Sequence, residues 1–451
     1  MPTDAGSVHY VGVCGAGMSA LAQFRAMGGG AATGSDRLLD HGETLSVRKA
    51  LEALMVKVYP QDGSGLTQAT SECVVSTAIE GDNPDLLAAK AKGIPVTHRA
   101  DALAREVSAN ETLAVAGTSG KSTVAGMVFE ILRAAKKDPS VTTGAGLNVL
   151  MRSGFLGNAW RGKGPLVIEA DESDGTLPKY APKFGLVLNV GKDHKEITEL
   201  QAMFKAFKER CGTCVVNADA PLLKDLQPGA LSYGFEAGEL RGEGLVFDGR
   251  SCGFSVYGVA FSLAHPGRHN AENALAAAAL AKAAGVGLET SAAALKRFAG
   301  VYRRFESLGV SRGVEVIDDY AHNPDKVRAV LAAAQARAKR VLAVFQPHGF
   351  APTRFLKNEF VAAFAEALRP EDKLWLTDIY YVGGTAAKDV SAADIALPVA
   401  ARGRSSRHVG DREKAADEMA AEAKAGDLVL VLGARDPSLN AYARGILKRL
   451  G

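Results

Sequence analysis

Short apolar runs alternate with stretches of helical periodicity along most of the chain. The apolar runs are four to eight residues long and end in glycine or polar residues, which is typical of buried parallel strands. Alternation of strands and helices predicts α/β structure with doubly wound parallel sheets. The runs that carry this prediction are 8–15, 31–36, 72–78, 94–99, 113–117, 167–171, 185–191, 314–318, 340–347, 373–379 and 427–433.

The alternation predicts three α/β domains. A chain of 451 residues is also too long for one ordinary core, at about 150 residues per domain. We expect an N-terminal Rossmann-like domain over 1–106, a central domain over 107–298 and a Rossmann-like C-terminal domain over 299–451. Within the second, the runs between about 230 and 264 predict an antiparallel excursion.

Composition limits the class of protein. Hydrophobic residues make up 47% and charged residues 23%, as in ordinary globular proteins. The net charge is +3, from 53 basic and 50 acidic residues, which leaves no electrostatic footprint for nucleic acid or an anionic membrane. The N-terminal residues do not show the basic segment and apolar stretch of a signal peptide. The sequence also contains no apolar run of about 18 or more residues, the length that a transmembrane helix needs. We therefore expect a cytoplasmic protein, monomeric or homodimeric, with small-molecule partners.

Five cysteines, an odd number, do not suggest a disulfide framework. Cys211 and Cys214 form a C-x-x-C pair, but no second pair completes a zinc site. Buried thiols are the favoured interpretation, and a redox or zinc site is the alternative.

A glycine-rich turn follows the first apolar run. Gly15, Gly17 and Ala20 fit the pattern G-x-G-x-x-[G/A], and Asp36 follows the next run. Taken alone, this arrangement indicates a Rossmann dinucleotide site and allows an NAD-dependent oxidoreductase.

A second glycine turn has the features of a phosphate-binding loop. The sequence LAVAGTSGKSTVAGMV over 113–128 places a strand, a turn and a helix in succession. Backbone N–H groups of such a turn face an anion, Lys121 adds charge, and the Ser122 hydroxyl can hold Mg²⁺. The full pattern expects glycine where Val115 stands, so the motif is the shorter GTSGKS. The alternative is a plain helix cap by Thr118 or Ser119.

Acidic and amide residues follow the next strands of the same domain. Carboxylates at a strand end beside a phosphate loop suit Mg²⁺ or a reacting group, with a solvated acidic turn as the alternative. A histidine at such a position can be a metal ligand or contact phosphate, or have no role. The residues concerned are Glu169, Asp171, Glu172 and Asp174, then Asn189, Asp193 and His194.

Arginines and further strand ends provide other candidates. Arg268, His269 and Asn270 are expected before a helix, where Asn270 can simply be its N-cap. Arginine suits a forked contact with phosphate, and polar clusters at strand ends suit ribose hydroxyls. Because such clusters recur in every domain, we expect a site between domains. The additional candidates are Arg303, Arg304, Asp318, Asp319, Tyr320, His322, His348 and Arg354.

Taken in order, these motifs resemble the Mur ligase family, most of all its alanine-adding members. The resemblance runs from about residue 8 to about 440. It is carried by VGVCGAGMSA, STAIEGDNPD, GIPVTHRADALA, GTSGKST, EADESDG, NVGKDH, RHNAENALAA, GVYRRFE, DDYAHNPDKV and FQPH.

The resemblance implies an activity in peptidoglycan synthesis. ATP would phosphorylate the carboxylate of UDP-N-acetylmuramate, and the amino group of an amino acid, L-alanine most closely, would displace phosphate from the acyl phosphate. The chemistry is reasonable because a carboxylate reacts with amines only after its oxygen becomes a leaving group. The first domain would then bind a UDP-sugar rather than NAD, and the central domain would be a P-loop ATPase.

The resemblance also assigns residues to roles. The phosphate loop Gly117, Thr118, Ser119, Gly120, Lys121, Ser122 and Thr123 would hold ATP, with Asn270, Arg304 and Asp319 at its adenosine or phosphates. Ser122, Glu169 and His194 would hold Mg²⁺, and Lys121, Glu169, His194, Arg304 and His348 would be catalytic. Gly15, Ala16, Gly17, Met18 and Ser19 would lie against UDP, with His348 and Arg354 near the amino acid.

The chain departs from the family pattern after FQPH. It has Gly349 and Pro352 where the alanine-adding members have arginines, which suit an amino-acid carboxylate; Arg354 can replace one of them. The loop GTSGKST replaces GTHGKTT, and LGARDPS replaces GAGD. Alternatives are therefore a ligase for another amino acid, peptide or acceptor, and a nucleotide-binding homologue with altered catalysis.

Overall fold

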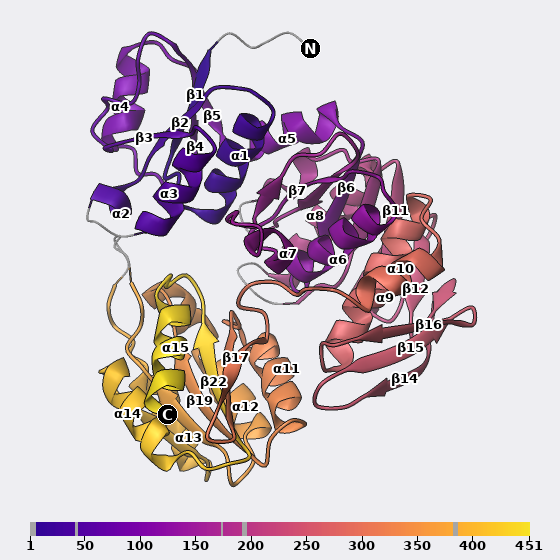
Figure 1. Cartoon of the computed structure of the whole chain (residues 1–451), viewed down its shortest axis with the longest axis vertical. Coiled ribbons are helices and arrows are strands. Elements are labelled where there is room, and N and C mark those ends of the chain that lie inside the picture. The colour runs from indigo at the N-terminus through magenta and orange to yellow at the C-terminus, as the bar shows by residue number, and fades with distance from the viewer. Residues whose placement is uncertain (1–5, 41–43, 173–174, 192–195, 382–386) are drawn as a thin grey trace. The chain divides into compact units, whose positions relative to one another are not determined.

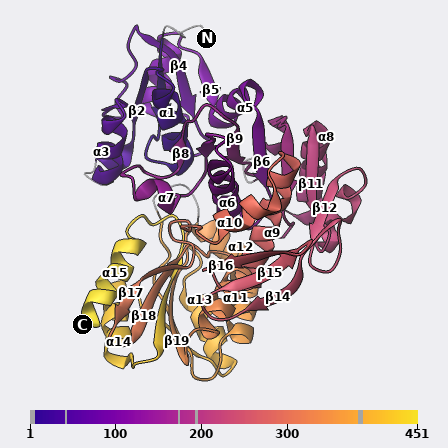
Figure 2. The same cartoon turned by 45° about the vertical axis from the view of Figure 1, so that its right-hand side comes forward.

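The computed structural model describes residues 6–40, 44–172, 175–191, 196–381 and 387–451. The chain forms two compact units, and both views of the chain show helices packed on sheets in each (Figures 1 and 2). The first unit consists of residues 1–245, 254–262 and 272–301, and the second of residues 246–253, 263–271 and 302–451.

The first unit begins with a parallel five-stranded sheet in the order β3-β2-β1-β4-β5. Its strands are β1 (Ser7–Val11), β2 (Ala32–Ser35), β3 (Lys57–Tyr59), β4 (Thr70–Val75) and β5 (Val96–His98). Its helices are α1 (Ala16–Met27), α2 (Arg37–Asp40), α3 (Leu45–Ala53), α4 (Pro84–Ala91) and α5 (Arg99–Ala109). Helix α4 begins where Asn83 caps it: the Asn83 side chain accepts hydrogen bonds from the backbone N–H groups of Asp85 and Leu86, and Pro84 occupies the first helical position.

A second sheet of eight strands follows in the order β13-β12-β11-β10-β6-β9-β7-β8. The strands are β6 (Thr112–Ala116), β7 (Ser140–Thr142), β8 (Ala159–Trp160), β9 (Leu166–Glu169), β10 (Phe184–Val187), β11 (Thr213–Asn217), β12 (Leu231–Gly234) and β13 (Leu240–Arg241). The helices are α6 (Lys121–Ala134), α7 (Asn148–Met151) and α8 (Ile197–Arg210), with 3₁₀ turns η1 (Leu177–Lys179) and η2 (Pro221–Leu226). Only β8 pairs antiparallel, with β7.

The register of this sheet brings strand ends together. Val115 of β6 pairs with Glu169 of β9 on one side and with Leu186 of β10 on the other. The carboxyl ends of the three strands therefore meet at one edge, where ligands of open α/β sheets bind.

A smaller three-stranded sheet, β14-β15-β16, occupies the predicted excursion. Its strands are β14 (Glu243–Phe247), β15 (Cys252–Val256) and β16 (Val259–Leu263), and it is followed by α9 (Arg268–Ala283) and α10 (Leu288–Leu295). Helix α9 begins earlier than expected. Arg268, His269 and Asn270 lie in its first turn rather than before it.

The second unit is built on a six-stranded sheet in the order β17-β18-β22-β19-β20-β21. Its strands are β17 (Glu306–Ser311), β18 (Val314–Asp319), β19 (Arg340–Gln346), β20 (Lys373–Leu376), β21 (Ser405–His408) and β22 (Asp427–Gly433). Its helices are α11 (Pro324–Gln335), α12 (Phe350–Ala367), α13 (Ala393–Ala401), α14 (Arg412–Glu422) and α15 (Leu439–Arg449). The edge strand β17 is antiparallel to β18, and the other pairs are parallel.

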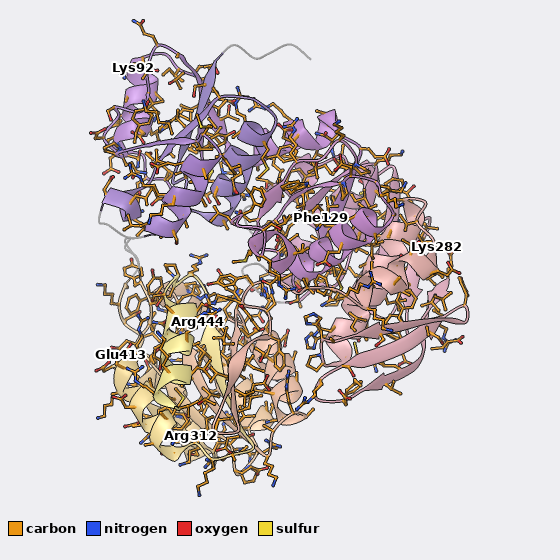
Figure 3. All side chains as sticks on the ribbon, viewed as in Figure 1. Lys92, Phe129, Lys282, Arg312, Glu413 and Arg444 are labelled. Carbon is orange, nitrogen blue, oxygen red and sulfur yellow. The ribbon has the colours of Figure 1, made fainter. Side chains whose placement is uncertain are left out.

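Apolar cores lie on the faces of these sheets. Phe129 of α6, labelled in Figure 3, is fully buried. The α/β prediction is confirmed, since apolar strands pack under helices in both units. The cysteines are all free thiols. The hydrogen bond with Cys214 and then burial raise the pKa of Cys211. Cys214 is buried and Cys211 is partly exposed, so the interpretation as buried thiols is confirmed for Cys214. Within the described ranges, the helices are too short or too polar to cross a membrane.

Candidate functional site

The phosphate loop lies between β6 and α6 and depends on its glycines. Gly120 is the N-cap of α6, with φ +88°, and makes no side-chain cap. The alternative of a cap by Thr118 or Ser119 is therefore wrong. A Cβ on Gly120 would lie 2.6 Å from Oδ1 of Asn273, and one on Gly117 would lie 2.9 Å from Cβ of Leu188. A Cβ at either position therefore requires a neighbour to move: the end of the Asn273 side chain at Gly120, and Leu188 at Gly117.

Asn189, at the end of β10, clamps this loop. Its Oδ1 accepts from the Thr118 hydroxyl at 3.0 Å and from the Ser119 N–H at 2.9 Å. Its Nδ2 donates to the Ser119 carbonyl at 3.1 Å. Asn189 therefore shapes the loop, a role that the sequence did not indicate. The residues Asp174, Asp193 and His194, which we expected nearby, lie outside the described residues.

Ser122 of α6 is hydrogen-bonded to Glu169, the last residue of β9, at the edge where the strands end. The Ser122 hydroxyl is 3.0 and 2.9 Å from the two carboxylate oxygens of Glu169. The Thr143 hydroxyl and the Gly144 N–H donate to Oε2 of the same carboxylate at 3.2 and 2.8 Å. Hydroxyl and carboxylate oxygens are the donors that Mg²⁺ prefers. Among the described residues, no group of three or more acidic, histidine or cysteine side chains forms a metal cluster.

Lys121 is held by the acidic segment after β9. Its ammonium is 2.6 Å from Oε2 of Glu172 and 3.8 Å from Oδ1 of Asp171. Burial lowers the pKa of Lys121, but the carboxylates of Glu172, Asp171 and Glu169 outweigh that effect and raise it overall. The lysine is therefore a fixed cation at the mouth of the loop. Its partner Glu172 is 4% exposed, so this part of the acidic segment is not a solvated turn.

The first glycine turn is shaped by Asp36. The carboxylate of Asp36 accepts from the N–H groups of Cys14 at 2.9 Å and Leu38 at 3.0 Å. Both carboxylate oxygens of Asp36 thus accept hydrogen bonds from backbone N–H groups. In a dinucleotide site, by contrast, this carboxylate binds the ribose hydroxyls. A Cβ on Gly17 would lie 2.8 Å from Nη1 of Arg99. Arg99 therefore borders this turn; in the sequence it stands directly after β5, within the motif GIPVTHRADALA.

In the second unit, Arg303 and Arg304 differ in role. Arg303 is 4% exposed, and its Nε donates to Asp318 at 2.9 Å and its Nη2 to the Gly433 carbonyl at 2.8 Å. Its guanidinium therefore links the ends of β18 and β22. Arg304 lies over the ring of Tyr320, 5.0 Å from the centroid.

Asp319 ends β18 and is buried. Its carboxylate accepts from the N–H groups of Phe305 at 2.6 Å and Ala321 at 2.7 Å. Burial raises its pKa to about 6. Asn270, also predicted near ATP, donates from Nδ2 to the Pro266 carbonyl at 2.7 Å and is not an N-cap.

Two histidines of the second unit lie together. The rings of His322 and His348 have centroids 5.4 Å apart, and burial lowers the pKa of His322 well below its ordinary value. Gly349, the N-cap of α12, has φ +70°. Arg354 in that helix donates from Nε to Asp389 at 2.9 Å and from Nη2 to the Ala387 carbonyl at 2.8 Å.

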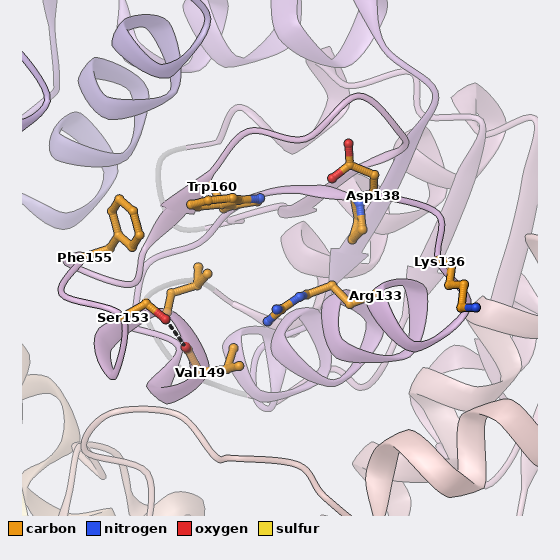
Figure 4. A pocket seen from close by; sticks show the side chains of 9 residues that line it. Arg133, Lys136, Asp138, Val149, Ser153, Phe155 and Trp160 are labelled. Carbon is orange, nitrogen blue, oxygen red and sulfur yellow. Dashed lines mark hydrogen bonds between the residues drawn. The ribbon is translucent and has the colours of Figure 1, made fainter.

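A pocket of about 330 Å³ in the first unit contains none of the predicted site residues. Figure 4 shows Trp160 on one side of it and Arg133 of α6 on another. Phe155 meets the Trp160 ring edge-on at 5.2 Å. The pocket is therefore separate from the phosphate loop.

Comparison with known proteins identifies this arrangement. Residues 7–110 match the model of the Mur ligase family catalytic domain, residues 115–281 the Mur ligase middle domain, and residues 303–435 the Mur ligase glutamate ligase domain. The first match covers the five-stranded sheet, the second most of the eight-stranded sheet and the three-stranded sheet, and the third the six-stranded sheet.

Relatives of known name match over nearly the whole chain. A UDP-N-acetylmuramate–L-alanine ligase of Pelotomaculum thermopropionicum is 35% identical and covers 95% of each chain. One from Arthrobacter sp. is 38% identical, over 94% of this chain and 91% of that protein. The crystal structure of a UDP-N-acetylmuramate–alanine ligase from Thermotoga maritima superposes with a TM-score of 0.80, 26% identity and 98% coverage of both chains.

Proposed function

Because the chain belongs to the Mur ligase family, we propose that it uses ATP to join L-alanine to the carboxylate of UDP-N-acetylmuramate. The observation that carries this proposal is the assembly of Lys121, Ser122 and Glu169 at one sheet edge. Full-length relatives that bear this activity in their names support the choice of substrates. Membership in a ligase family also displaces the oxidoreductase alternative.

The residues of the phosphate loop and of the neighbouring strand end fit a nucleoside triphosphate with Mg²⁺. Gly117 and Gly120 both have positive φ, and at a glycine without a side chain the backbone N–H groups can approach phosphate closely. Ser122 and Glu169 offer oxygen ligands, and His194 is proposed as a further ligand on the family pattern. When bound, ATP supplies the phosphoryl group that turns the substrate carboxylate into an acyl phosphate.

The chain's own residues then have separable tasks. Lys121 stabilises negative charge on the phosphoryl oxygens, in competition with Glu172. Asn189 keeps the loop in shape. Glu169 accepts hydrogen bonds from the hydroxyls of Ser122 and Thr143, and these contacts fix the orientation of its carboxylate beside the phosphate loop.

Roles for the other predicted residues remain proposals. We place Gly15, Ala16, Gly17, Met18 and Ser19 against the UDP moiety, with Arg99 beside them. Asn270, Arg304 and Asp319 are proposed to contact adenosine or phosphates, and His348 to face the amino acid. The domain ranges 1–106, 107–298 and 299–451 and the cytoplasmic location also stay predictions.

A second candidate is a ligase of the same type for another amino acid or a peptide. Gly349 and Pro352 stand where the family pattern has arginines, and Arg354 is already paired with Asp389. An amino-acid carboxylate would have to compete with Asp389 for that guanidinium.

The test is release of phosphate from ATP with Mg²⁺, UDP-N-acetylmuramate and each common amino acid in turn, with product masses measured. We expect release with L-alanine and a product heavier by one alanyl group. Lys121→Ala should lose turnover by about a thousandfold, because the transferring phosphoryl loses its cation. Lys183→Ala, which removes an exposed partner of Glu111, is the control.

Each other outcome is informative. Release only with a different amino acid would establish the second candidate. Phosphate release by Lys121→Ala at the wild-type rate would show that the phosphate loop is not the active site.

A further inference from the structure

Asn158 joins the loop before β8 to the first turn of α1. Its Nδ2 donates to the Ala16 carbonyl at 2.7 Å and to the Ser19 hydroxyl at 2.8 Å. The Asn158 residue is 5% exposed and Ser19 is 2% exposed. The contacts therefore fix the turn from within the unit rather than at its surface.

Gln23, one turn further along α1, completes this cluster. Its Nε2 donates to Oδ1 of Asn158 at 2.8 Å and to the Ser19 carbonyl at 3.0 Å. Gln23 is fully buried. Both polar atoms of the Asn158 side chain thus have partners on α1, whereas among the described residues Oε1 of Gln23 has none.

The backbone of Asn158 continues the connection toward the phosphate loop. Its carbonyl accepts from the Thr143 N–H at 2.9 Å. Thr143 in turn donates its hydroxyl to Glu169 at 3.2 Å, and Glu169 contacts Ser122. A continuous series of hydrogen bonds therefore links the first glycine turn to the predicted metal ligands.

We propose that Asn158 is a positioning residue that fixes the glycine turn 15–19, and with it the nucleotide sugar, relative to the strand end that carries Glu169. The inference rests on the proposed function in taking that turn as the UDP-sugar site. Asn158 itself acts through the turn and touches no reacting atom. Its effect should fall on UDP-sugar binding and leave nucleotide triphosphate binding in place.

Calorimetric titration tests the ligand part of the inference. UDP-N-acetylmuramate and the Mg²⁺ complex of a non-hydrolysable ATP analogue are each titrated into the wild-type chain, Asn158→Ala and Asn158→Asp. The aspartate keeps the size and the acceptor but loses the donor. Asn110→Ala, which removes a similar amide contact to the Glu106 carbonyl at the end of α5, is the matched control.

We expect both Asn158 variants to bind UDP-N-acetylmuramate about tenfold more weakly, and the control to change by less than about twofold. Binding of the ATP analogue should stay within about twofold in all variants, which also shows that they are folded. Unchanged UDP-sugar affinity would overturn the inference. Equal weakening of both ligands would also overturn it, because Asn158 would then be a general structural residue.

Hydrogen exchange without ligand tests the positioning itself. The peptide that spans α1 should exchange its amide hydrogens faster in the Asn158 variants than in the wild type or in Asn110→Ala, because the turn loses its anchor. Unchanged exchange would overturn the inference. If the wild-type chain does not bind UDP-N-acetylmuramate, the proposed function fails, and the exchange comparison alone decides on Asn158.

Discussion

Lys121 is paired with the carboxylates that follow β9. Its ammonium lies 2.6 Å from Glu172, and both groups are largely withdrawn from solvent. A triphosphate bound in the loop competes with Glu172 for the three N–H donors of the lysine, and the carboxylate opposes the incoming negative charge. Asp171 is further away and 40% exposed, so its influence is smaller.

Replacing Glu172 by Gln should tighten binding of an ATP analogue with Mg²⁺. The reason is that the amide competes less for Lys121 and no longer repels phosphate. We expect a gain of about threefold to tenfold, equivalent to roughly 1 kcal/mol, measured by calorimetric titration. Asp171→Asn should change the affinity much less. Weaker binding in Glu172→Gln would contradict this account and would place Glu172 among the groups that hold the metal complex.

Several site residues could be predicted because their chemistry is local in sequence. Lys121 and Ser122 follow from the loop spacing, and Glu169 from its place at a strand end. Asn189 is also predicted from its place after a strand, but its role in holding the phosphate loop is not, and Asn158 is not predicted at all. Asn189 bonds to Thr118 across 71 positions, and Asn158 to Ala16 across 142. Their roles depend on which strands become neighbours, which the local pattern does not state.

At the scale of elements, the start of α6 is set by backbone geometry rather than by a side-chain cap. Gly120 has φ +88°, in the left-handed region that favours glycine. Asn273 of α9 lies against it, so a helix distant in sequence closes one side of the loop. The apolar pattern predicted α6 and its strand, but the contact with α9 and the start of α9 at Arg268 came only from the structure.

Gly120→Ala should weaken binding of the ATP analogue by about tenfold or more, since the new Cβ meets Asn273 and the strained backbone must shift. Gly154→Ala is a matched control. Gly154 also has φ +88°, but nothing lies within 4 Å of a Cβ there, so strain is added without a clash and away from the loop. Calorimetric titration of both variants distinguishes the two effects. Equal affinities in Gly120→Ala and the wild type would show that the loop tolerates a side chain.

At the scale of the whole molecule, the order of the motifs along the chain is what indicates the family. The motifs follow one another in the order that is typical of the Mur ligase family: the phosphate loop, the acidic strand end, the arginines after α10 and the histidines of the second unit. The residues that match the family models span 7–435 with two gaps. That order could be predicted from the sequence. The choice of L-alanine rests on the family resemblance and not on the residues after FQPH, because Gly349 and Pro352 depart from the family pattern and Arg354 is paired with Asp389.

The central claim is that the carboxylate of the sugar substrate is activated by phosphorylation before the amine attacks. Transfer of labelled oxygen tests this claim most directly. UDP-N-acetylmuramate whose carboxylate carries the heavy isotope of oxygen is turned over with ATP, Mg²⁺ and L-alanine, and the released phosphate is analysed by mass spectrometry. The account predicts one labelled oxygen in each phosphate, because the acyl phosphate breaks between carbon and oxygen. Phosphate released without label during amide formation would contradict it.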